Sequence, residues 1–336
     1  MRDVLRAGTD VDCGSFVGKN AQSALTKKTI TEADIDVRLK LLFKVRMRLQ
    51  HFDPPGALQQ IPTSDICSSY AKALAADGPA QSCALLKNAG NTLPLKKGAN
   101  VAVIGPNANL SSADAGYYGP HNVCDGKFWT SIDAVTAYAG KTTSCAGVPT
   151  VKSNDTSGIA AAVAMAAAAD DVVLVVGTDL TWAAEGHDAD PVHGITFTAA
   201  QMMLIAKCAA AAKKPITVLT LTATPLDLTA VMANPKVGAI VHAGQPSVAA
   251  MGIGDVLFGK VSPAGRTIQT VYPSAYATQV SIFDFNMRPG PSAFPAPGCV
   301  CKTGTMPGCC PRGVNPGRTH RFYTGKAVVP FGFGLS

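Results

Sequence analysis

The sequence predicts an α/β protein in which helices cover both faces of a parallel sheet. Three observations point to this class. Hydrophobic residues make up 47% of the 336-residue chain and charged residues only 15%, which supplies enough apolar side chain for a large core. Four short runs are apolar along their whole length, as strands buried on both faces of a sheet are. These runs alternate with Ala-rich helical stretches, and that alternation is typical of a parallel sheet.

The N-terminal part of the chain carries two of the expected helices. Residues 4–14 are expected to form a short strand that ends in a polar loop. Thr31 then begins a helix that runs to about Leu49, because an acid follows three residues later, as in a capping box, and apolar residues recur at helical spacing. Consecutive prolines end this helix. A second helix is expected over 65–86, and a turn-rich passage follows it.

The sheet itself is expected in the middle of the chain. The expected strands cover 100–105, 171–177, 215–222 and 237–244, and the expected helices cover 159–169, 198–212 and 246–259. The strand runs are short and rich in β-branched residues, whereas the helical runs are longer and rich in alanine. After residue 262 the chain is expected to consist of turns and short segments.

Charge and hydropathy exclude two classes of partner. The net charge is +7, from 29 basic and 22 acidic residues, but the lysines and arginines are scattered in short pairs such as Lys27–Lys28. Without a basic stripe interleaved with aromatics, we expect no nucleic-acid partner. No apolar run reaches the ~20 strongly apolar residues of a membrane span, so we expect no membrane partner. The first residues are charged throughout and show no signal-peptide pattern.

Ten cysteines are many for a chain of this length. Four of them crowd into one segment, Cys299, Cys301, Cys309 and Cys310. Their spacing lacks the paired C-x-x-C ligands of a zinc knuckle. We expect disulfides formed in a secretory compartment, with a zinc site and free thiols as the alternatives. Glycosylation triplets at Asn109 and Asn154 fit the surface of a secreted protein.

One glutamate, Glu185, stands in the loop just past the expected strand 171–177, with no basic residue beside it in the sequence. Sheets of this class bind ligands in the loops beyond the carboxyl ends of their strands. A carboxylate half-buried there without a cation would have a raised pKa and could donate a proton. The position is therefore functional in type, and an ordinary surface glutamate is the alternative.

Eleven segments, in order over nearly the whole chain, carry a more specific likeness. They are "AGTDVDCG", "ITEADIDVRLKLLFKVRMRLQHFDPP", "LLKNAGNTLPL", "VAVIGPNA", "GYYGP", "VVLVVGTD", "EGHD", "GDVLFGKVSPAGR", "VYP", "FNMRP" and "GRTHRFYTG...PFGFGLS". One such string would be weak evidence of relationship. Together, in this order, they resemble glycoside hydrolase family 3, most closely its β-xylosidase/α-L-arabinofuranosidase branch.

The resemblance implies a domain division. In the family a (β/α)8 barrel precedes an α/β sandwich. By this likeness residues 1–50 are a barrel remnant, 51–84 a linker, 85–270 the sandwich domain and 271–336 a return segment with the Cys-rich loop. The expected fold class is therefore α/β, a parallel-sheet α/β/α sandwich preceded by the last strand and helix of an incomplete (β/α)8 barrel. Because one strand and one helix cannot close a barrel, we expect the apolar face of 35–49 to lack its cover.

The resemblance also implies a chemistry. It is exo-acting, retaining hydrolysis of O-glycosyl bonds in xylosides or arabinosides, without a cofactor or a metal. Such hydrolysis needs two carboxylates about 5–5.5 Å apart. The likeness matches Glu185 to the loop that supplies the general acid/base, whereas the nucleophile's motif is expected before residue 1. Asp10 and Asp12 belong to a different motif, so we expect an incomplete copy of an enzyme.

The same loop departs from the family, and its neighbours are candidate sugar contacts. Ala183 replaces a first glutamate, and an alanine replaces the usual arginine after Asp188. The expected substrate-binding residues are His187 and Asp188 in this loop and Tyr117 and Tyr118 in "GYYGP". A surface position for the histidine and interface packing for the tyrosines are the alternatives. The expected partner is an oligosaccharide, and the expected location is extracellular or secretory.

Two other classes of function remain as alternatives. A non-catalytic carbohydrate-binding or scaffold protein derived from the family would retain xylose without hydrolysing xylosides. A nucleotide- or sugar-phosphate-binding module would use the glycine in "VAVIGPNANLSSADAG". That stretch lacks the G-x-G-x-x-G pattern, and the chain has no G-K-[ST] motif, so the second alternative is the weaker one.

Overall fold

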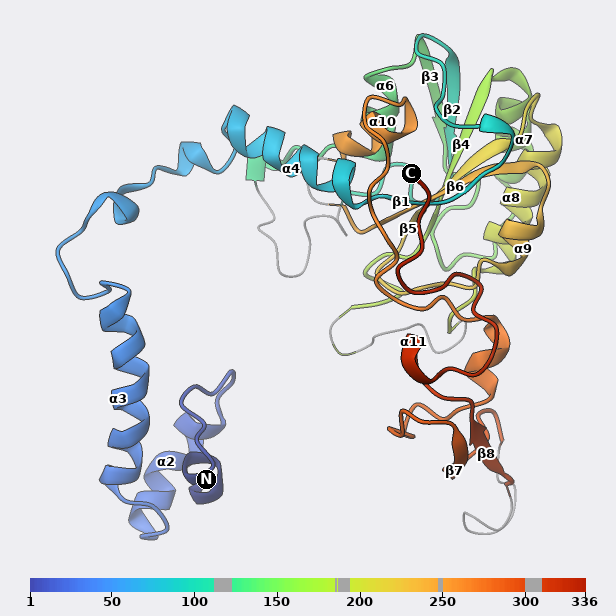
Figure 1. The fold of residues 1–336 in the computed structure, drawn as a ribbon. Coiled ribbons are helices and arrows are strands. Elements are labelled where there is room, and N and C mark those ends of the chain that lie inside the picture. Colours follow the sequence, from blue (N-terminus) through green and yellow to red (C-terminus); the bar gives the residue numbers. More distant parts are fainter. Residues whose placement is uncertain (112–122, 185, 187–193, 247–249, 300–309) are drawn as a thin grey trace. The chain divides into compact units, whose positions relative to one another are not determined.

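The structure is a computed structural model that describes residues 1–111, 123–184, 186, 194–246, 250–299 and 310–336. The chain divides into two compact units, Met1–Asp65 and Ile66–Ser336 (Figure 1). The first contains only helices and the second contains the sheet. Among the described residues, the helices are all too short or too polar to cross a membrane.

The first unit has three α-helices and two short 3-10 turns. They are α1 (Arg2–Arg6), α2 (Phe16–Thr26), α3 (Glu32–Arg48), η1 (Ala57–Gln60) and η2 (Thr63–Asp65). The capping box expected at Thr31 is confirmed. The Asp34 carboxylate accepts the Thr31 N–H at 2.9 Å, and Thr31 Oγ1 accepts the Asp34 N–H at 3.3 Å. These two bonds satisfy donors that a helix start otherwise leaves unpaired.

The short strand expected over 4–14 is wrong. Residues 2–6 form α1, and no strand lies anywhere in Met1–Asp65. A strand must pair with a neighbouring strand to satisfy its backbone groups, and this unit offers none. A helix satisfies them locally instead: the Ala7 N–H donates to Asp3 O at 2.8 Å.

The apolar face of α3 is exposed, as expected from the isolated helix. No residue of α3 is buried, and Met47 is 64% exposed. The interior of the unit is limited to a small cluster around Leu5, Ala24 and Ile30. Most of the apolar surface of α3 therefore contributes nothing to the stability of the unit as it stands.

The second unit is built on a mostly parallel sheet, which confirms the expected sandwich. Its strands are β1 (Ala84–Asn88), β2 (Asn100–Ile104), β3 (Lys141–Cys145), β4 (Asp171–Gly177), β5 (Ile216–Leu221) and β6 (Val237–Gly244). The spatial order is β1-β6-β5-β4-β2-β3, and β1 alone runs antiparallel to its neighbour. The four apolar strands expected from the sequence are present, whereas β1 and β3 were not anticipated.

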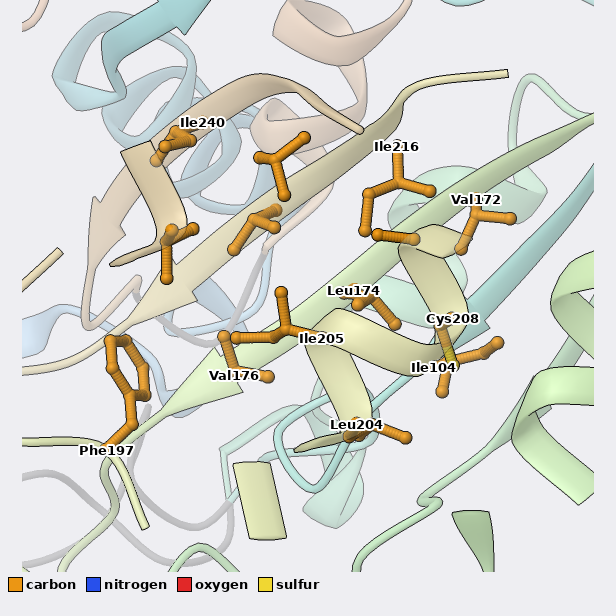
Figure 2. Close-up of a cluster of buried hydrophobic side chains, with 14 of the residues drawn as sticks. Ile104, Val172, Leu174, Val176, Phe197, Leu204, Ile205, Cys208, Ile216 and Ile240 are labelled. Atoms are coloured by element: carbon orange, nitrogen blue, oxygen red, sulfur yellow. The ribbon is translucent and has the colours of Figure 1, made fainter. Parts of the chain in front are cut away.

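Alternate side chains of the strands pack into two separate cores. Ile104, Leu174 and Ile240 point to one face, where α7 (Ile159–Ala168) and α8 (Ala199–Ala211) cover them (Figure 2). Val103 and Val175 belong to the opposite face. All five side chains are fully buried, and each stabilises the fold by about 1.5–3 kcal/mol. Burial on both faces is the reason these strands are apolar throughout.

The remaining helices complete the two layers. They are α4 (Ser69–Ser82), α6 (Ser131–Thr136), α9 (Thr229–Ala233) and α10 (Met251–Leu257), with 3-10 turns η3 (Ala89–Asn91) and η4 (Val123–Gly126). The helix expected over 65–86 is thus shorter, because Ala84–Asn88 pairs as β1 at the sheet edge. α10 packs against both α4 and α6. α6 and α10 cover the second face of the sheet (Figure 1), whereas Val231 of α9 belongs to the first core.

The last quarter of the second unit returns to the sheet and carries a hairpin. The return segment contains η5 (Ser274–Thr278), β7 (Gly290–Pro295), β8 (Arg312–Asn315) and α11 (Thr319–Phe322). Near the C-terminus, Leu335 forms a bridge to Leu85 of β1. β7 pairs antiparallel with β8, and this hairpin lies apart from the six-stranded sheet (Figure 1).

Two disulfides confirm the expectation of oxidised cysteines. Cys299 pairs with Cys310 in the Cys-rich segment, and Cys67 pairs with Cys124. The second bond ties the residue just before α4 to the end of the loop that follows β2. Four of the described cysteines are free, Cys13, Cys83, Cys145 and Cys208. Burial raises the pKa of the Cys83 thiol to about 12, so this group is an inert part of the core.

The contact between α4 and α10 depends on Gly252. A Cβ at this position would lie 2.0 Å from Ala76 O, whereas a Cβ at Gly78 on α4 would meet no atom within 4 Å. We expect Gly252→Ala to lower the unfolding free energy by about 1–3 kcal/mol, because the two helices must move apart. Gly78→Ala should raise it by about 0.5–1 kcal/mol, since alanine is the better helix former. Urea titration of both variants checks this, and equal effects of the two changes would contradict the packing described.

Candidate active site

The order of the strands locates the candidate site. From β2 the chain moves outward to β3 and then returns to the other side of β2 as β4. Sheets of this kind bind ligands outside the carboxyl ends of the two strands where the order reverses. The five site residues expected from the sequence all lie in the two loops that leave β2 and β4. The topology therefore brings together two loops that the sequence separates by about seventy residues.

The expected site residues themselves, Glu185, His187, Asp188, Tyr117 and Tyr118, lie outside the described residues. The described residues on either side show how the two loops begin. A small group of buried polar side chains at the carboxyl ends of β2, β4 and β5 holds the first residues of both loops in place.

The loop after β2 starts with a glycine, and any other residue at this position would displace the neighbouring strand β4. Gly105 has a φ of 135°, and a Cβ there would lie 2.0 Å from Val175 O on β4. This close approach brings Asn107, whose side chain is fully buried, next to the first residue after β4. Asn107 Nδ2 donates to Thr178 O at 2.8 Å, so the first turns of the two loops are joined directly.

The loop after β4 starts from a second such glycine. Gly177 has a φ of 146°, and its N–H donates to Gln201 Oε1 at 3.0 Å. Gln201 is fully buried on α8, and its Nε2 donates to Val151 O at 2.8 Å and to Gly177 O at 3.2 Å. Thr178 Oγ1 then bonds Thr222 Oγ1 at 2.9 Å. Each polar contact is buried, which holds the start of the loop in one position.

The loop stays anchored as far as the described residues reach. Asp179 Oδ1 accepts the Thr181 N–H at 2.9 Å, and Trp182 is fully buried. Ala183 is 7% exposed and belongs to the same apolar cluster as Trp182. The position at which the resemblance places a first glutamate is thus part of the core here. A carboxylate at that position would be buried among apolar groups at a high cost.

A cation that the sequence did not place beside the loop lies next to it in the structure. Lys152 Nζ donates to Thr181 O at 2.7 Å, four residues before Glu185. The sequence around the loop shows no basic residue, yet a lysine from a distant segment contacts the loop in the fold.

Three other described carboxylates, in either unit, have structural roles. Asp227 accepts the Thr229 N–H at 2.8 Å and the Ser274 N–H at 2.7 Å. In the first unit, Asp10 pairs with Arg38 at 3.0 Å, and Asp12 accepts the Val17 N–H at 2.8 Å. Within the described part of the chain, no group of three His, Cys, Asp or Glu side chains is arranged to hold a metal ion.

Asn107 and Gln201 were not singled out from the sequence. Asn107 has a recognisable signal, because a Gly-Pro-Asn triplet directly follows an apolar strand. Gln201 has none, since a glutamine in an Ala-rich helix is usually exposed.

A small cavity lies beside this polar group, at the ends of β5 and β6. Its volume is about 30 Å³, and its polar lining includes Thr220, Thr222 and His242. That is room for about two water molecules. Thr220 Oγ1 lies 3.0 Å from His242 Nδ1. Burial lowers the pKa of His242, so the imidazole is held neutral at neutral pH.

Replacing Asn107 tests the junction between the two loops. We expect Asn107→Ala to lower the unfolding free energy by about 1–3 kcal/mol, because it leaves the buried Thr178 carbonyl without its donor. Asn109→Ala is the matched control in unglycosylated protein, since this asparagine is exposed and its loss should change stability by less than about 0.5 kcal/mol. Urea unfolding followed by tryptophan fluorescence measures both. Equal stabilities of the two variants would contradict the junction.

His242 predicts a pH dependence of stability. Its folded-state pKa lies below the unfolded value of 6.5, so below pH 6.5 the unfolded chain takes up a proton more readily than the folded one. The stability advantage of the wild type over His242→Gln should be full above pH 6.5 and should shrink as the pH falls toward the lower folded-state pKa. Melting temperatures of both proteins between pH 4.5 and 8 measure it, and parallel curves would contradict a buried neutral imidazole.

Comparison with known proteins gives the same family throughout. The chain is 34% identical to "Probable beta-D-xylosidase 6" of Arabidopsis thaliana over 342 aligned residues, which is 100% of this chain and 40% of that protein. It is 34% identical to "Beta-xylosidase/alpha-L-arabinofuranosidase 2" of Medicago sativa subsp. varia, over 98% of the chain and 40% of that protein. The chain therefore spans about two fifths of the length of these relatives.

Solved structures agree with the fold. The GH3 exo-beta-xylosidase XlnD, in complex with a xylobiose aziridine activity-based probe, superimposes with a TM-score of 0.82 at 29% identity, over 99% of this chain and 40% of that one. A beta-glucosidase from Listeria innocua superimposes with a TM-score of 0.74 at 18% identity, which supports the fold alone. The model of the "Glycosyl hydrolase family 3 C-terminal domain" matches residues 83–336, and the chain belongs to that family.

Proposed function

We propose that the protein acts in the hydrolysis of β-xylosides or α-L-arabinofuranosides, with retention of configuration, and that Glu185 is its general acid/base. The observation that carries the proposal is the junction of Asn107 with Thr178 at the point where the strand order reverses. That junction fixes the start of the loop after β4 at the edge where such sheets bind ligands, and the sequence of this loop includes Glu185. Membership in the family and the named activities of the relatives supply the reaction class.

The distribution of carboxylates supports Glu185 over its neighbours. The chain has only two glutamates, and the other, Glu32, begins α3 in the first unit. Asp179 and Asp227 are occupied as acceptors for backbone N–H groups. Ala183 is buried and carries no charge. Asp188 and Asp190 follow in the same loop, and Glu185 is proposed over them because the family resemblance matches it to the position of the acid/base.

In the proposed reaction Glu185 performs two proton transfers. The carboxylic acid first protonates the glycosidic oxygen as the bond between that oxygen and the anomeric carbon breaks. The resulting carboxylate then takes a proton from water, which attacks the covalent glycosyl intermediate. We infer that the nucleophile comes from a carboxylate other than those of residues 1–336. His187, Asp188, Tyr117 and Tyr118 are proposed to contact the sugar.

The proposed setting is an oxidising one. The disulfides Cys67–Cys124 and Cys299–Cys310 suit an extracellular or secretory location, where such bonds persist. Exposed side chains at Asn109 and Asn154 suit glycosylation there. The division of the chain at residues 50, 84 and 270 remains a prediction.

Glu185→Ala tests the proposal, in the protein at the full length that cells produce. Loss of the acid should slow hydrolysis of xylobiose by about 100- to 10,000-fold, because its leaving group must be protonated. Hydrolysis of 4-nitrophenyl β-xyloside should fall much less in its first step, and azide should restore turnover and give β-xylosyl azide. Glu32→Ala is the matched control and should hydrolyse both substrates at the wild-type rate.

Three results would contradict the assignment. The first is an undiminished rate for Glu185→Ala on xylobiose. The second is slow turnover of 4-nitrophenyl β-xyloside by Glu185→Ala that azide does not restore, and the third is the same loss of activity in Glu32→Ala. Glu185→Gln, with an unchanged melting temperature, separates loss of the acid from loss of the fold. A wild-type protein that retains xylose but hydrolyses neither substrate would instead support the non-catalytic carbohydrate-binding alternative. The buried alanine at position 183 is the observation in its favour.

A further inference from the structure

The segment between Tyr272 and Lys326 has an unusual charge distribution. Its basic residues are Arg288, Lys302, Arg312, Arg318, Arg321 and Lys326, and its single acidic residue is Asp284. Asp284 is 1% exposed and accepts the Asn286 N–H at 3.0 Å. The described surface of this segment therefore presents cations without any exposed carboxylate to balance them.

The same segment exposes aromatic and apolar side chains. Phe285 is 85% exposed, Phe283 is 65% exposed and Met287 is 42% exposed. The Phe283 ring lies 6.3 Å from the Phe294 ring on β7, so these two rings form a pair at the surface. Exposed aromatic side chains that gather on one segment are suited to binding a partner.

A cleft of about 380 Å³ directly follows Phe283 and Phe285 along the chain. Residues 286–291 and Asn315 of β8 line it, and the volume is within the range of small-ligand sites. Its walls are held together by hydrogen bonds across the hairpin. Asn315 Nδ2 donates to Asn286 O at 2.7 Å, and the Arg318 N–H donates to Met287 O at 2.9 Å. The cleft is thus part of a fixed framework.

Arg288 supplies the polar group of the cleft. Its guanidinium carbon lies 4.7 Å from the centre of the Phe322 ring, a cation–π contact that orients the group. Among the described residues no carboxylate forms an ion pair with Arg288. Its N–H donors are therefore available for an anion, and a guanidinium binds a carboxylate with two parallel hydrogen bonds.

We propose that the Phe–Arg cleft binds a uronic-acid-bearing polysaccharide without hydrolysing it. By this name we mean the cleft lined by residues 286–291 and Asn315, together with the exposed Phe283, Phe285 and Phe294 of the same segment. The aromatic rings would stack on the apolar faces of the sugars, and Arg288 would pair with a uronate carboxylate. A neutral glycan would leave the guanidinium without its partner, which is the reason for the acidic class. The choice of a glycan over other anions rests on the proposed function, but the cleft is independent of Glu185.

The test is the binding of glucuronoxylan to the whole protein by affinity electrophoresis, with neutral arabinoxylan, dextran sulfate and phosphatidylserine vesicles as comparison ligands. We expect glucuronoxylan to bind about tenfold more tightly than arabinoxylan, since one charge-assisted pair distinguishes them. Arg288→Gln and Phe285→Ala should each weaken binding about tenfold. Arg48→Gln removes one exposed charge elsewhere and should change binding less than about twofold.

Several outcomes would overturn the proposal. One is undiminished binding by Arg288→Gln with an unchanged melting temperature, and another is equal affinity for arabinoxylan. Dextran sulfate binding that Arg48→Gln and Arg288→Gln weaken equally would show general charge attraction only. Vesicle binding that depends on Phe285 and Arg288, without glucuronoxylan binding, would assign the cleft to a lipid surface. Binding is also measured with the Glu185→Ala variant. If the proposed hydrolysis proves wrong, the binding result therefore still tests the cleft.

Discussion

The close approach of backbones at the carboxyl ends of β2, β4 and β5 is the constraint on which the candidate site depends. A Cβ on Gly105 would lie 2.0 Å from Val175 O, and a Cβ on Gly177 would lie 1.9 Å from Leu221 O. Both glycines have positive φ angles that other residues rarely adopt. Each turns the chain across the top of the neighbouring strand, and Asn107 and Thr178 thereby meet. Any side chain at either glycine would push apart the strands that the two cores hold together.

This constraint explains how a loop can carry chemistry on a rigid scaffold. The sheet is buried on both faces, so its strands have little freedom to shift. The hydrogen bonds of Gln201 hold Gly177, the last residue of β4, and buried Trp182 anchors the loop further along. A catalytic group needs such support, because a displacement of about 1 Å can cost two orders of magnitude in rate. The Phe–Arg cleft at the β7–β8 hairpin differs from this site. Its side chains are exposed, and they lie on a hairpin that is separate from the six-stranded sheet.

The apolar pattern was sufficient to predict the sandwich but not all of its parts. The strands β2, β4, β5 and β6 are central, and their continuous apolar runs reflect burial on both sides. The edge strand β3, "KTTSC", is partly exposed and polar, so it carries no such signal. Residues 4–14 looked like a strand because of their composition, yet a strand depends on a partner that composition does not report. The site region could be placed from family resemblance and strand order, whereas Asn107, Gln201 and Lys152 act through contacts between distant segments that no local pattern encodes.

The central claim is that the loop after β4 supplies the acid/base, and a crystal structure tests it most directly. The measurement is the distance from the side chain at position 185 to the glycosidic oxygen, in Glu185→Gln protein of the length that cells produce, soaked with xylobiose. The account predicts about 2.6–3.2 Å, the reach of a proton donor. A separation beyond about 5 Å, or another carboxylate within hydrogen-bond distance of that oxygen, would contradict it.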